Sequence, residues 1–460
     1  MRSMVEPEGA DADEFMKHMF EYWRKEVVQK QIVRKFRRDF YPRAAIAKQQ
    51  PIEFEVEPSP KLYLDLNSSR VKVTLRITDP KTNAAIILAD HVGPINLLGQ
   101  TMWADILVEM GGKLLNETTN GLYPYRAYVE TLLSVDDDSK EMYYGVEGWK
   151  KDDPAKIAHI NVDDAVAANK NPGLTERMSW FASGTQVEFT FRPHVEIFQQ
   201  QLLIPSMAAF RMKLYPSRDS FVLNCPTESA VVVGGVNVPN SSFNLEIVEC
   251  VFKVETREVT QPLELAHISE LVKGNNMRFH VRRVEPRQFT IVPNHQGQTF
   301  DPIVSGILPD RILAFFVDQK ARDGSYQLNP LNFEHCDVRE ISLYVNGELN
   351  NGQTIKCDFT GPKKQTLEGY LTLYEAMDQL YKDRPVPVVY KDWAQGYTIF
   401  GFDITPDGSA GTCPNGIRKG VIGMRIEFRT APTKPYNLII LSEGEGIYEL
   451  DQHGEVVIVQ

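Results

Sequence analysis

Three adjacent residues carry side chains of the kinds that build metal sites and catalytic sites: His335, Cys336 and Asp337. Imidazole, thiolate and carboxylate groups bind zinc, and a thiol beside an imidazole can act as a nucleophile. Adjacent residues of a strand point to opposite faces, however, and no partner at ligand spacing stands nearby. We therefore expect ordinary packing roles here and no metal site.

Paired aspartates between Asp136 and Asp164 could hold calcium. They lack the regular one-three-five oxygen spacing and the glycine of a calcium-binding loop. We expect the segment from Ser134 to Pro172 to be a long, solvated surface insertion.

Signatures of nucleophilic or nucleotide-dependent catalysis are missing from the sequence. It contains no GxSxG elbow and no GxxxxGK[ST] phosphate loop. The run from Gly408 to Gly411 reads as a turn, and Gly234-Gly235 reads as a bulge in a valine-rich strand. We expect no enzymatic activity and no cofactor.

The composition of the chain excludes further classes of protein. The chain has 460 residues and a formal charge of −11, so its surface as a whole cannot coat nucleic acid and any polyanion contact must be local. Five widely spaced cysteines without a CxxC motif indicate reduced thiols. Because we find no apolar run of membrane-spanning length and no signal peptide, we expect synthesis in the cytoplasm without secretion by that route.

Most of the chain has the residue pattern that is typical of β-strands. Apolar residues alternate with polar ones over 62–66, 71–77, 187–191 and 424–428, which predicts half-buried strands of an all-β sandwich fold. Within this β-rich part, helical spacing occurs at Leu367–Tyr381 and, more weakly, around His267–Val272.

The N-terminal segment differs from the rest. Apolar residues recur every four positions from Phe15 to Phe40, which predicts a helix over about 13–40 that ends before Pro42. Its opposite side is basic, so we predict a basic amphipathic arm over residues 1–50. The basic residues are Lys30, Arg34, Lys35, Arg37 and Arg38. The arm either contacts packaged DNA, an internal membrane or a neighbouring subunit, or docks on its own domain.

Local residue types predict a hairpin and the loop that precedes it. Ile341–Val345 leads into Asn346-Gly347, a dipeptide that tolerates positive φ at both centres of a tight hairpin. Pro330 biases Asn329 away from helical geometry, so the segment before this hairpin is expected to be a loop between strands.

Three longer blocks resemble one known family. They are GLYPYRAYVETLL at 121–133, LPDRILAFFVDQKARDGSYQLNPLNFEHCDVREISLYVNGEL at 308–349, and GYTIFGFDITPD at 396–407. Their order is similar to that in the double jelly-roll major capsid proteins of Polinton (Maverick) elements and adintoviruses. The resemblance extends from about Pro51 to the C-terminus.

The resemblance implies two tandem jelly-roll β-sandwiches after the arm, over residues 51–260 and 261–460. It implies a structural protein of the virion whose homotrimers form pseudo-hexagonal capsomers of an icosahedral shell, with penton or minor capsid proteins as further partners and assembly in cytoplasm or nucleus. Motif positions expected to serve fold and loop geometry are Pro124, Tyr125, Arg126, Asn329, Pro330, Asn332, Phe333, Asn346, Gly347, Gly396, Tyr397, Phe402 and Asp403.

Three other functions are compatible with a jelly-roll fold. A minor capsid or penton protein would normally need one jelly-roll, and a carbohydrate- or receptor-binding module would usually be exported. An enzyme with a site on the sandwich loops should show convergent polar groups, which we did not find. On the capsid interpretation, removal of residues 1–50 should leave the sandwiches folded and impair assembly.

Overall fold

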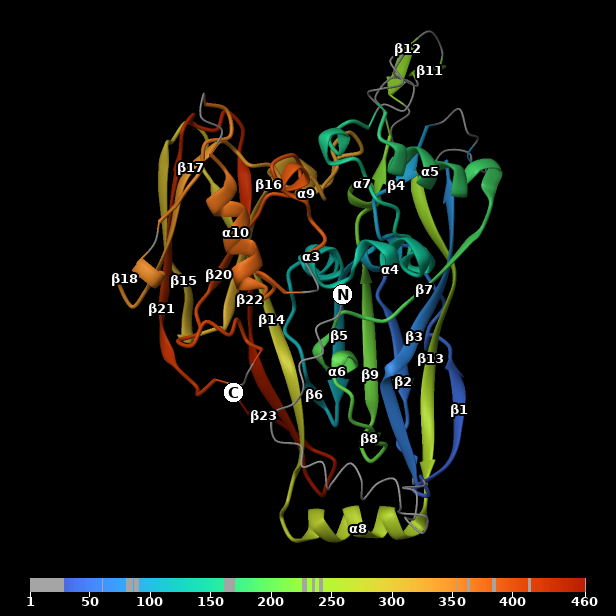
Figure 1. Cartoon of the computed structure of the whole chain (residues 1–460). Helices are drawn as coiled ribbons and strands as arrows, with labels where there is room; N and C mark the ends of the chain where they lie inside the picture. Colours follow the sequence, from blue (N-terminus) through green and yellow to red (C-terminus); the bar gives the residue numbers. More distant parts are fainter. Residues whose placement is uncertain are drawn as a thin grey trace, which may run out of the picture.

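The structure is a computed structural model that describes residues 29–59, 61–79, 86, 91–160, 170–225, 243–352, 354–361, 365–382, 386–412 and 415–459, together with the backbone of 230–233 and 236–239. Two β-sandwiches stand side by side, and a helix at one end lies beneath both of them (Figure 1).

The first sandwich consists of two antiparallel sheets. One sheet has the order β1-β13-β3-β7, with β8 also paired to β3, and the other has the order β2-β9-β5-β6. The strands are β1 (Ile32–Phe40), β2 (Ile52–Val56), β3 (Leu62–Thr78), β5 (Trp103–Met110), β6 (Lys113–Leu114), β7 (Val187–Phe191), β8 (Ile204–Pro205), β9 (Phe210–Pro216) and β13 (Asn244–Val259). Val71, Val73, Leu75 and Ile77 of β3 are all buried, as their alternation predicted.

The second sandwich repeats this plan. Its sheets have the orders β14-β22-β16-β20, with β23 paired to β22, and β15-β21-β17-β18, with β19 paired to β17. The strands are β14 (Met277–Ile291), β15 (Gly297–Ile307), β16 (Arg311–Asp318), β17 (Val338–Val345), β18 (Glu348–Leu349), β19 (Ile355–Lys356), β20 (Ile399–Asp403), β21 (Lys419–Phe428), β22 (Tyr436–Leu450) and β23 (Val456–Val459). Asn346 and Gly347 join β17 to β18 with φ angles of 52° and 85°, which confirms the predicted hairpin.

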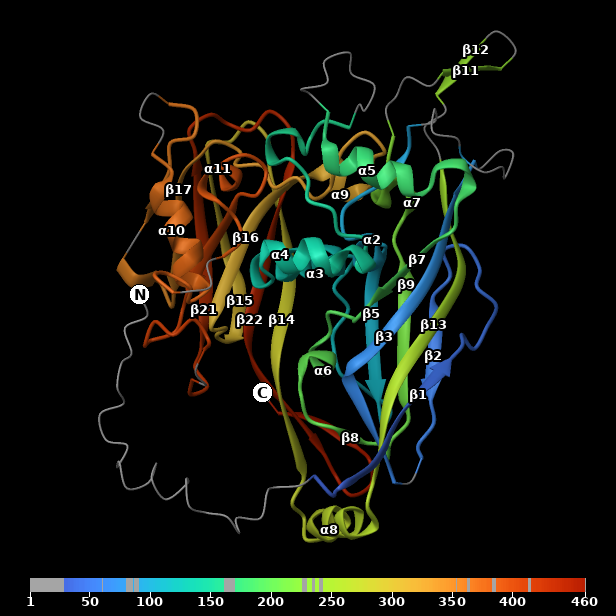
Figure 2. The same cartoon turned by 45° about the vertical axis from the view of Figure 1, so that its right-hand side comes forward.

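Helices and short strand pairs occupy the connections (Figure 2). The helices are α2 (Leu98–Thr101), α3 (Tyr123–Ser134), α4 (Asp137–Met142), α5 (Pro172–Trp180), α6 (Glu196–Gln199), α7 (Asp219–Val222), α8 (Gln261–Val272), α9 (Gln319–Asp323), α10 (Leu367–Ala376) and α11 (Tyr390–Trp393). The short pairs are β4 (Gly93–Pro94) with β10 (Leu223–Asn224), and β11 (Ala230–Val233) with β12 (Val236–Pro239). Both helices predicted in the β-rich body are present, as α10 and α8.

The predicted helix is wrong where the N-terminal segment is described. Residues Ile32–Phe40 form β1, which pairs antiparallel with β13 at the edge of the first sandwich. Residues four apart share a face in a strand as well as in a helix, so the spacing of Ile32, Phe36 and Phe40 fits both elements. This stretch therefore belongs to the first sandwich and not to a separate arm over residues 1–50. The part before residue 29 lies outside the described residues.

The aspartate-rich insertion is also more structured than predicted. Asp136 caps α4 by accepting a hydrogen bond from the Ser139 amide at 3.3 Å. Asp152 is fully buried against Arg177 of α5. Asp163 and Asp164 lie outside the described residues. The expectation of a solvated loop is wrong for the folded parts of this insertion.

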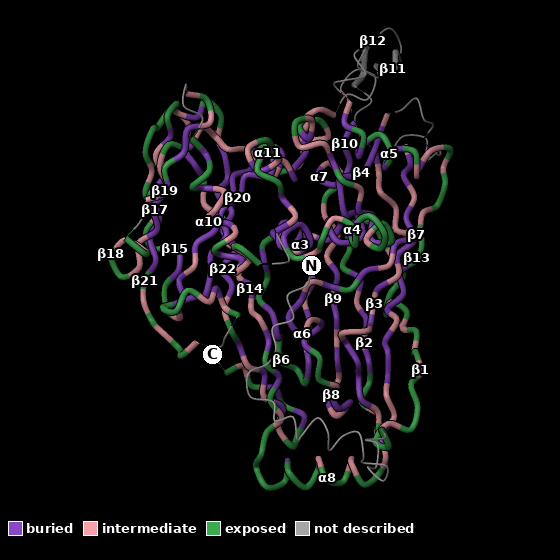
Figure 3. The backbone as a smooth tube through the Cα atoms, in the orientation of Figure 1, coloured by how far each residue is buried: buried purple, intermediate pink, exposed green. Residues whose placement is uncertain are grey.

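One cluster of buried hydrophobic residues extends through both halves, and Figure 3 shows buried backbone, in purple, in the strands of each. The cluster includes Trp103 and Phe252 of the first sandwich together with Phe315 and Ile440 of the second. The first pair of sheets uses strands between residues 32 and 259, the second uses strands between 277 and 459, and α8 connects them. Residue 260 remains our proposed boundary between the domains.

Candidate functional site: the seam between the sandwiches

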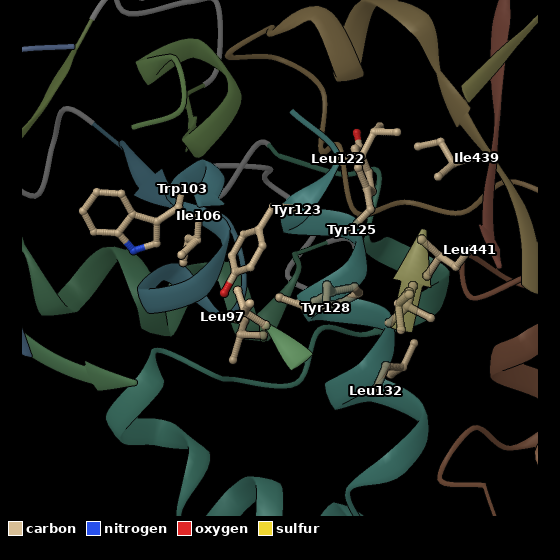
Figure 4. Packing of buried hydrophobic residues seen from close by; sticks show 14 of the residues in the cluster. Leu97, Trp103, Ile106, Leu122, Tyr123, Tyr125, Tyr128, Leu132, Ile439 and Leu441 are labelled. Carbon is tan, nitrogen blue, oxygen red and sulfur yellow. The ribbon is translucent and has the colours of Figure 1, made fainter. Parts of the chain in front are cut away.

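Helix α3 lies between the two sandwiches and forms the centre of the surface where they meet, which we call the seam. The helix begins at Tyr123, and Pro124 occupies its first turn, where the missing amide hydrogen costs nothing. Ten of its twelve residues are buried, so the helix is enclosed on all sides. Figure 4 shows its side chains between Trp103 and Ile106 on one side and Ile439 and Leu441 of β22 on the other.

Aromatic rings from both halves pack together across the seam. The ring centroids of Tyr125 and Phe315 are 6.1 Å apart, and those of Tyr128 and Phe333 are 5.9 Å apart in an edge-on arrangement. Phe315 and Phe333 lie 4.4 Å apart and link the two contacts. Each such pair adds about 0.5–1.5 kcal/mol beyond the area it buries. The seam is therefore an extension of the core.

A buried charge network lies beside these rings. Arg126 is only 2% exposed, and its guanidinium donates to Glu130 and to Glu196, each at 2.8 Å. It also approaches the carbonyl of Val284 in β14 at 3.5 Å, and Glu196 accepts a hydrogen bond from the Val284 amide at 3.4 Å. The network thus ties a helix of the first sandwich to the backbone of the second.

The pKa of Glu130 reflects this environment. Burial by itself raises the pKa of the carboxyl, but the charge of Arg126 and the hydrogen bond with His194 outweigh burial and lower the pKa to about 2. The carboxylate consequently stays charged at any ordinary pH and keeps the buried guanidinium paired.

The two motif loops of the second half meet at the seam. The Phe333 amide donates to the carbonyl of Gly396 at 2.9 Å, and the Thr398 amide donates to the carbonyl of Phe333 at 3.2 Å. From this joined pair of loops, the side-chain amide of Asn329 donates to the carbonyl of Ile157 in the first half at 3.2 Å. Gly396 faces the same segment. A Cβ placed on it would lie 2.7 Å from Ile157 Cγ2 and 2.9 Å from the carbonyl oxygen of Pro154.

The structure thus brings some motif positions together and leaves others apart. Nine of these positions lie at the seam or in the two joined loops: Pro124, Tyr125, Arg126, Asn329, Pro330, Asn332, Phe333, Gly396 and Tyr397. Asn346 and Gly347 form the distant β17–β18 turn, where Asn346 Oδ1 accepts from the Val421 amide at 2.9 Å. Phe402 lies in β20, and Asp403, the last residue of that strand, accepts from the amides of Thr405 and Ala410 to shape the following turn.

The basic residues of the N-terminal segment are placed on β1. Arg34 pairs with Glu258 of β13, while Lys35 and Arg37 both pair with Glu255 at 3.4 and 2.5 Å. Arg38 lies over the ring of Phe40, and Lys30 precedes the strand in an exposed position. Three of the five cations are therefore matched by carboxylates of the neighbouring strand.

Sequence reasoning missed several residues that hold the seam and the insertion. Tyr128 falls inside the motif block at 121–133, but its stacking on Trp149 and its contact with Phe333 are long-range features. Glu196 lies 70 residues from its partner Arg126, and no local spacing connects them. Asp152 lies in the segment whose composition indicated a solvated loop, and its partner Arg177 follows the end of that segment, so no local pattern links the two.

A tight turn holds His335, Cys336 and Asp337 and is closed by a hydrogen bond from the Val338 amide to the His335 carbonyl at 3.0 Å. His335 stacks on Phe359 at 4.4 Å, and its Nδ1 accepts a hydrogen bond from the Asp337 amide at 2.9 Å. Burial raises the pKa of the Cys336 thiol well above its ordinary value, so this thiol is a poor nucleophile. Within the described ranges no three His, Cys, Asp or Glu residues gather as metal ligands would.

Comparisons with known proteins agree with this architecture. No family model matches the chain. An uncharacterised protein of Caenorhabditis elegans is 20% identical over 421 residues, which is 88% of this chain and 93% of the relative.

Several solved viral structures share the fold. A chain of the Sputnik virophage structure matches with a TM-score of 0.63 at 10% identity, covering 100% of this chain and 93% of its own length. The mavirus major capsid protein matches with a TM-score of 0.54 at 11% identity, covering 95% and 92%. The Faustovirus major capsid protein matches with a TM-score of 0.55 at 9% identity, covering 94% and 93%.

These similarities place the chain in an architectural class. It is a double jelly-roll: two tandem antiparallel sandwiches, with few helices, that align over nearly their whole length with viral capsid proteins.

Proposed function

We propose that this protein is the structural major capsid protein of a Polinton-like or adintovirus-like element, and that it acts without enzymatic chemistry. The observation that carries the proposal is the complete double jelly-roll, which matches the mavirus and Faustovirus major capsid proteins over at least 94% of this chain. The three sequence blocks that resemble the Polinton capsid family support the finer assignment. The nematode relative supports a source in an animal genome.

The seam gives this proposal a physical basis. A shell unit made from two sandwiches per chain must hold both at a fixed angle, because a small error in one chain is repeated across the lattice. Aromatic stacking, the Arg126 network and the Asn329 hydrogen bond cross the seam and resist such movement. Three such rigid pairs around a three-fold axis present six similar blocks, which is the outline of a pseudo-hexagonal capsomer.

The proposed partners follow from this assembly. They are further copies of the chain, first in a homotrimer and then in a lattice, and penton or minor capsid proteins at the vertices. The protein would then reside in the virion. Contact of the basic N-terminal segment with packaged DNA or an internal membrane also stays a proposal. Across the described part of the chain, no helix has the length and apolar character needed to cross a membrane.

Light scattering coupled to size exclusion tests the proposal on the full chain. The chain mass is 52.3 kDa, so a trimer has a mass of 3 × 52.3, or about 157 kDa. A peak of that mass that persists on dilution, or shells eluting in the void volume, supports a capsomer. A monomer at every concentration contradicts it and favours the carbohydrate- or receptor-binding alternative, which an array of immobilised glycans would then examine. A stable pentamer would favour a penton or minor capsid protein.

A further inference from the structure

Helix α8 exposes an apolar stripe that nothing in the described structure covers. The helix lies across the lower end of both sandwiches and is mostly exposed (Figures 1 and 3). Leu265, Ile268 and Val272 are 56%, 43% and 68% exposed. Their spacing of three and then four residues places them on one face of the helix.

A groove runs along the other side of α8. It has a volume of about 560 Å³ and separates the helix from the ends of β1, β13 and β14. Its walls are largely apolar and include Ile32, Leu203, Val259, Leu263, Leu271 and Phe279. Leu202 on its border is 56% exposed. The stripe lies on the opposite face of the helix from this groove and is what we call the α8 surface, formed by Leu265, Ile268 and Val272.

The N-terminal segment of the same chain ends beside this surface. The amide of Thr260, the residue before α8, donates a hydrogen bond to the carbonyl of Gln31 at 2.8 Å. Residues 1–28 are outside the described structure. Val27 is four residues from Gln31, so it cannot lie more than about 14 Å from that anchor. The segment must therefore leave the body of the protein next to the start of α8.

The sequence of that segment suits the α8 surface. Phe15, Met19, Trp23 and Val27 recur every four residues. As a helix, Phe15–Val27 would extend about 18 Å, which is also about the length of the twelve-residue α8. Being tethered a few residues away gives the segment a high effective concentration at this surface.

We propose that Phe15–Val27 packs its apolar side chains on the α8 surface of its own chain. Two other occupants fit less well. Membrane-surface helices are rich in Lys and Arg, whereas this segment also carries Glu21 and Glu26 with only three basic residues, Lys17, Arg24 and Lys25. A second copy of the chain lacks the short tether. The proposal is independent of the capsid function, because it concerns a contact within one chain.

Cysteine cross-linking of the full chain tests the proposal. In the double variant Trp23→Cys with Ile268→Cys, mild oxidation should give a disulfide within one chain, seen as a monomer band whose tryptic digest contains the linked peptides. The matched control pairs Trp23→Cys with Val421→Cys, since Val421 is 41% exposed on β21 of the second sandwich and should not cross-link. A disulfide between two chains, or no more product than in the control, would overturn the proposal.

Limited proteolysis gives a second readout that needs no new thiol. Trypsin cuts after Arg24 and Lys25, which lie inside the proposed contact. Ile268→Asp and Val272→Asp should each speed this cleavage several-fold by opposing apolar packing, whereas Val421→Asp should leave its rate unchanged. Equal cleavage rates in all three variants and the parent chain would contradict docking on α8, as would protection that appears only after vesicles of anionic lipid are added.

Discussion

Gly396 shows how little room the seam leaves at single positions. Its φ angle of 110° is a conformation that other residues adopt only with strain, and an added Cβ would also meet Ile157 and Pro154 of the first sandwich. Asp152 and Arg177 illustrate a second kind of constraint, because both side chains are completely buried and each depends on the other. Arg177 further donates to the carbonyls of Pro94 and Lys150, at 3.0 and 2.9 Å.

We predict that Gly396→Ala lowers the free energy of unfolding by about 2–4 kcal/mol, the sum of backbone strain and overpacking. Gly306→Ala is the matched control, since Gly306 has a φ angle of 118° but open space where a Cβ would go. It should show only the strain, about 1 kcal/mol. Urea unfolding followed by tryptophan fluorescence measures both. Equal losses in the two variants would refute steric closure at the seam.

Asp152→Ala should cost about 3–5 kcal/mol, because it leaves the Arg177 guanidinium buried and uncompensated. The exposed pair of Arg425 with Glu427, at 2.6 Å, provides the comparison. Arg425→Ala should change the unfolding free energy by less than about 1 kcal/mol. The same urea titration compares the two variants, and a small effect of Asp152→Ala would show that Arg177 finds other partners.

At the scale of whole elements, α3 carries the coupling between the sandwiches. Tyr125 and Tyr128 face aromatic rings of the second half, and Arg126 approaches the β14 backbone. Because the ring contacts and the contact of Arg126 with Val284 join distant parts of the chain, a loss of α3 packing should weaken both sandwiches.

Acid should weaken this element through Glu130. The folded pKa of about 2 lies below the ordinary value of 4.5, so the stabilisation is fully present above pH 4.5 and is lost as the pH falls toward 2. The shift of the pKa from 4.5 to about 2 corresponds to about 3 kcal/mol. Thermal unfolding monitored by circular dichroism should show a midpoint that falls over this range in the parent chain and falls less in Glu130→Gln. Parallel curves for the two proteins would refute the assignment.

The elements also show what could be predicted from the sequence. Alternation located β3, β7 and β21 because one face of each strand carries the apolar residues that enter the core and the other is largely polar. The Asn346-Gly347 dipeptide located its hairpin because few residues tolerate positive φ. Four-residue spacing failed at β1, since it is shared by both element types and the pairing with β13 decides between them. Tyr128, Phe333 and Glu196 reach the seam from distant parts of the sequence through tertiary folding. Local sequence patterns do not predict such contacts.

The strand identity of Ile32–Phe40 changes the truncation that tests the N-terminal segment. Removal of residues 1–50 would strip β1 from β13 and remove the charges that neutralise Glu255 and Glu258. We predict a clearly lower thermal midpoint for a chain lacking residues 1–50 than for one lacking residues 1–28, measured by circular dichroism. Indistinguishable midpoints would mean that β1 adds nothing to the first sandwich.

At the scale of the whole molecule, one core runs through two sandwiches, so the chain behaves as a single block with two similar lobes. Such a block suits a lattice, because its outer loops can vary without disturbing the buried seam. The proposed building unit is a trimer, in which three copies of the chain close around an axis.

The proposed trimer can be tested by electron microscopy of the purified full chain. We predict averaged particles with three-fold symmetry and six lobes of similar size, alone or arranged in closed shells. Averages that show only isolated two-lobed particles, across the protein concentrations and salt conditions that keep the chain folded, would contradict it.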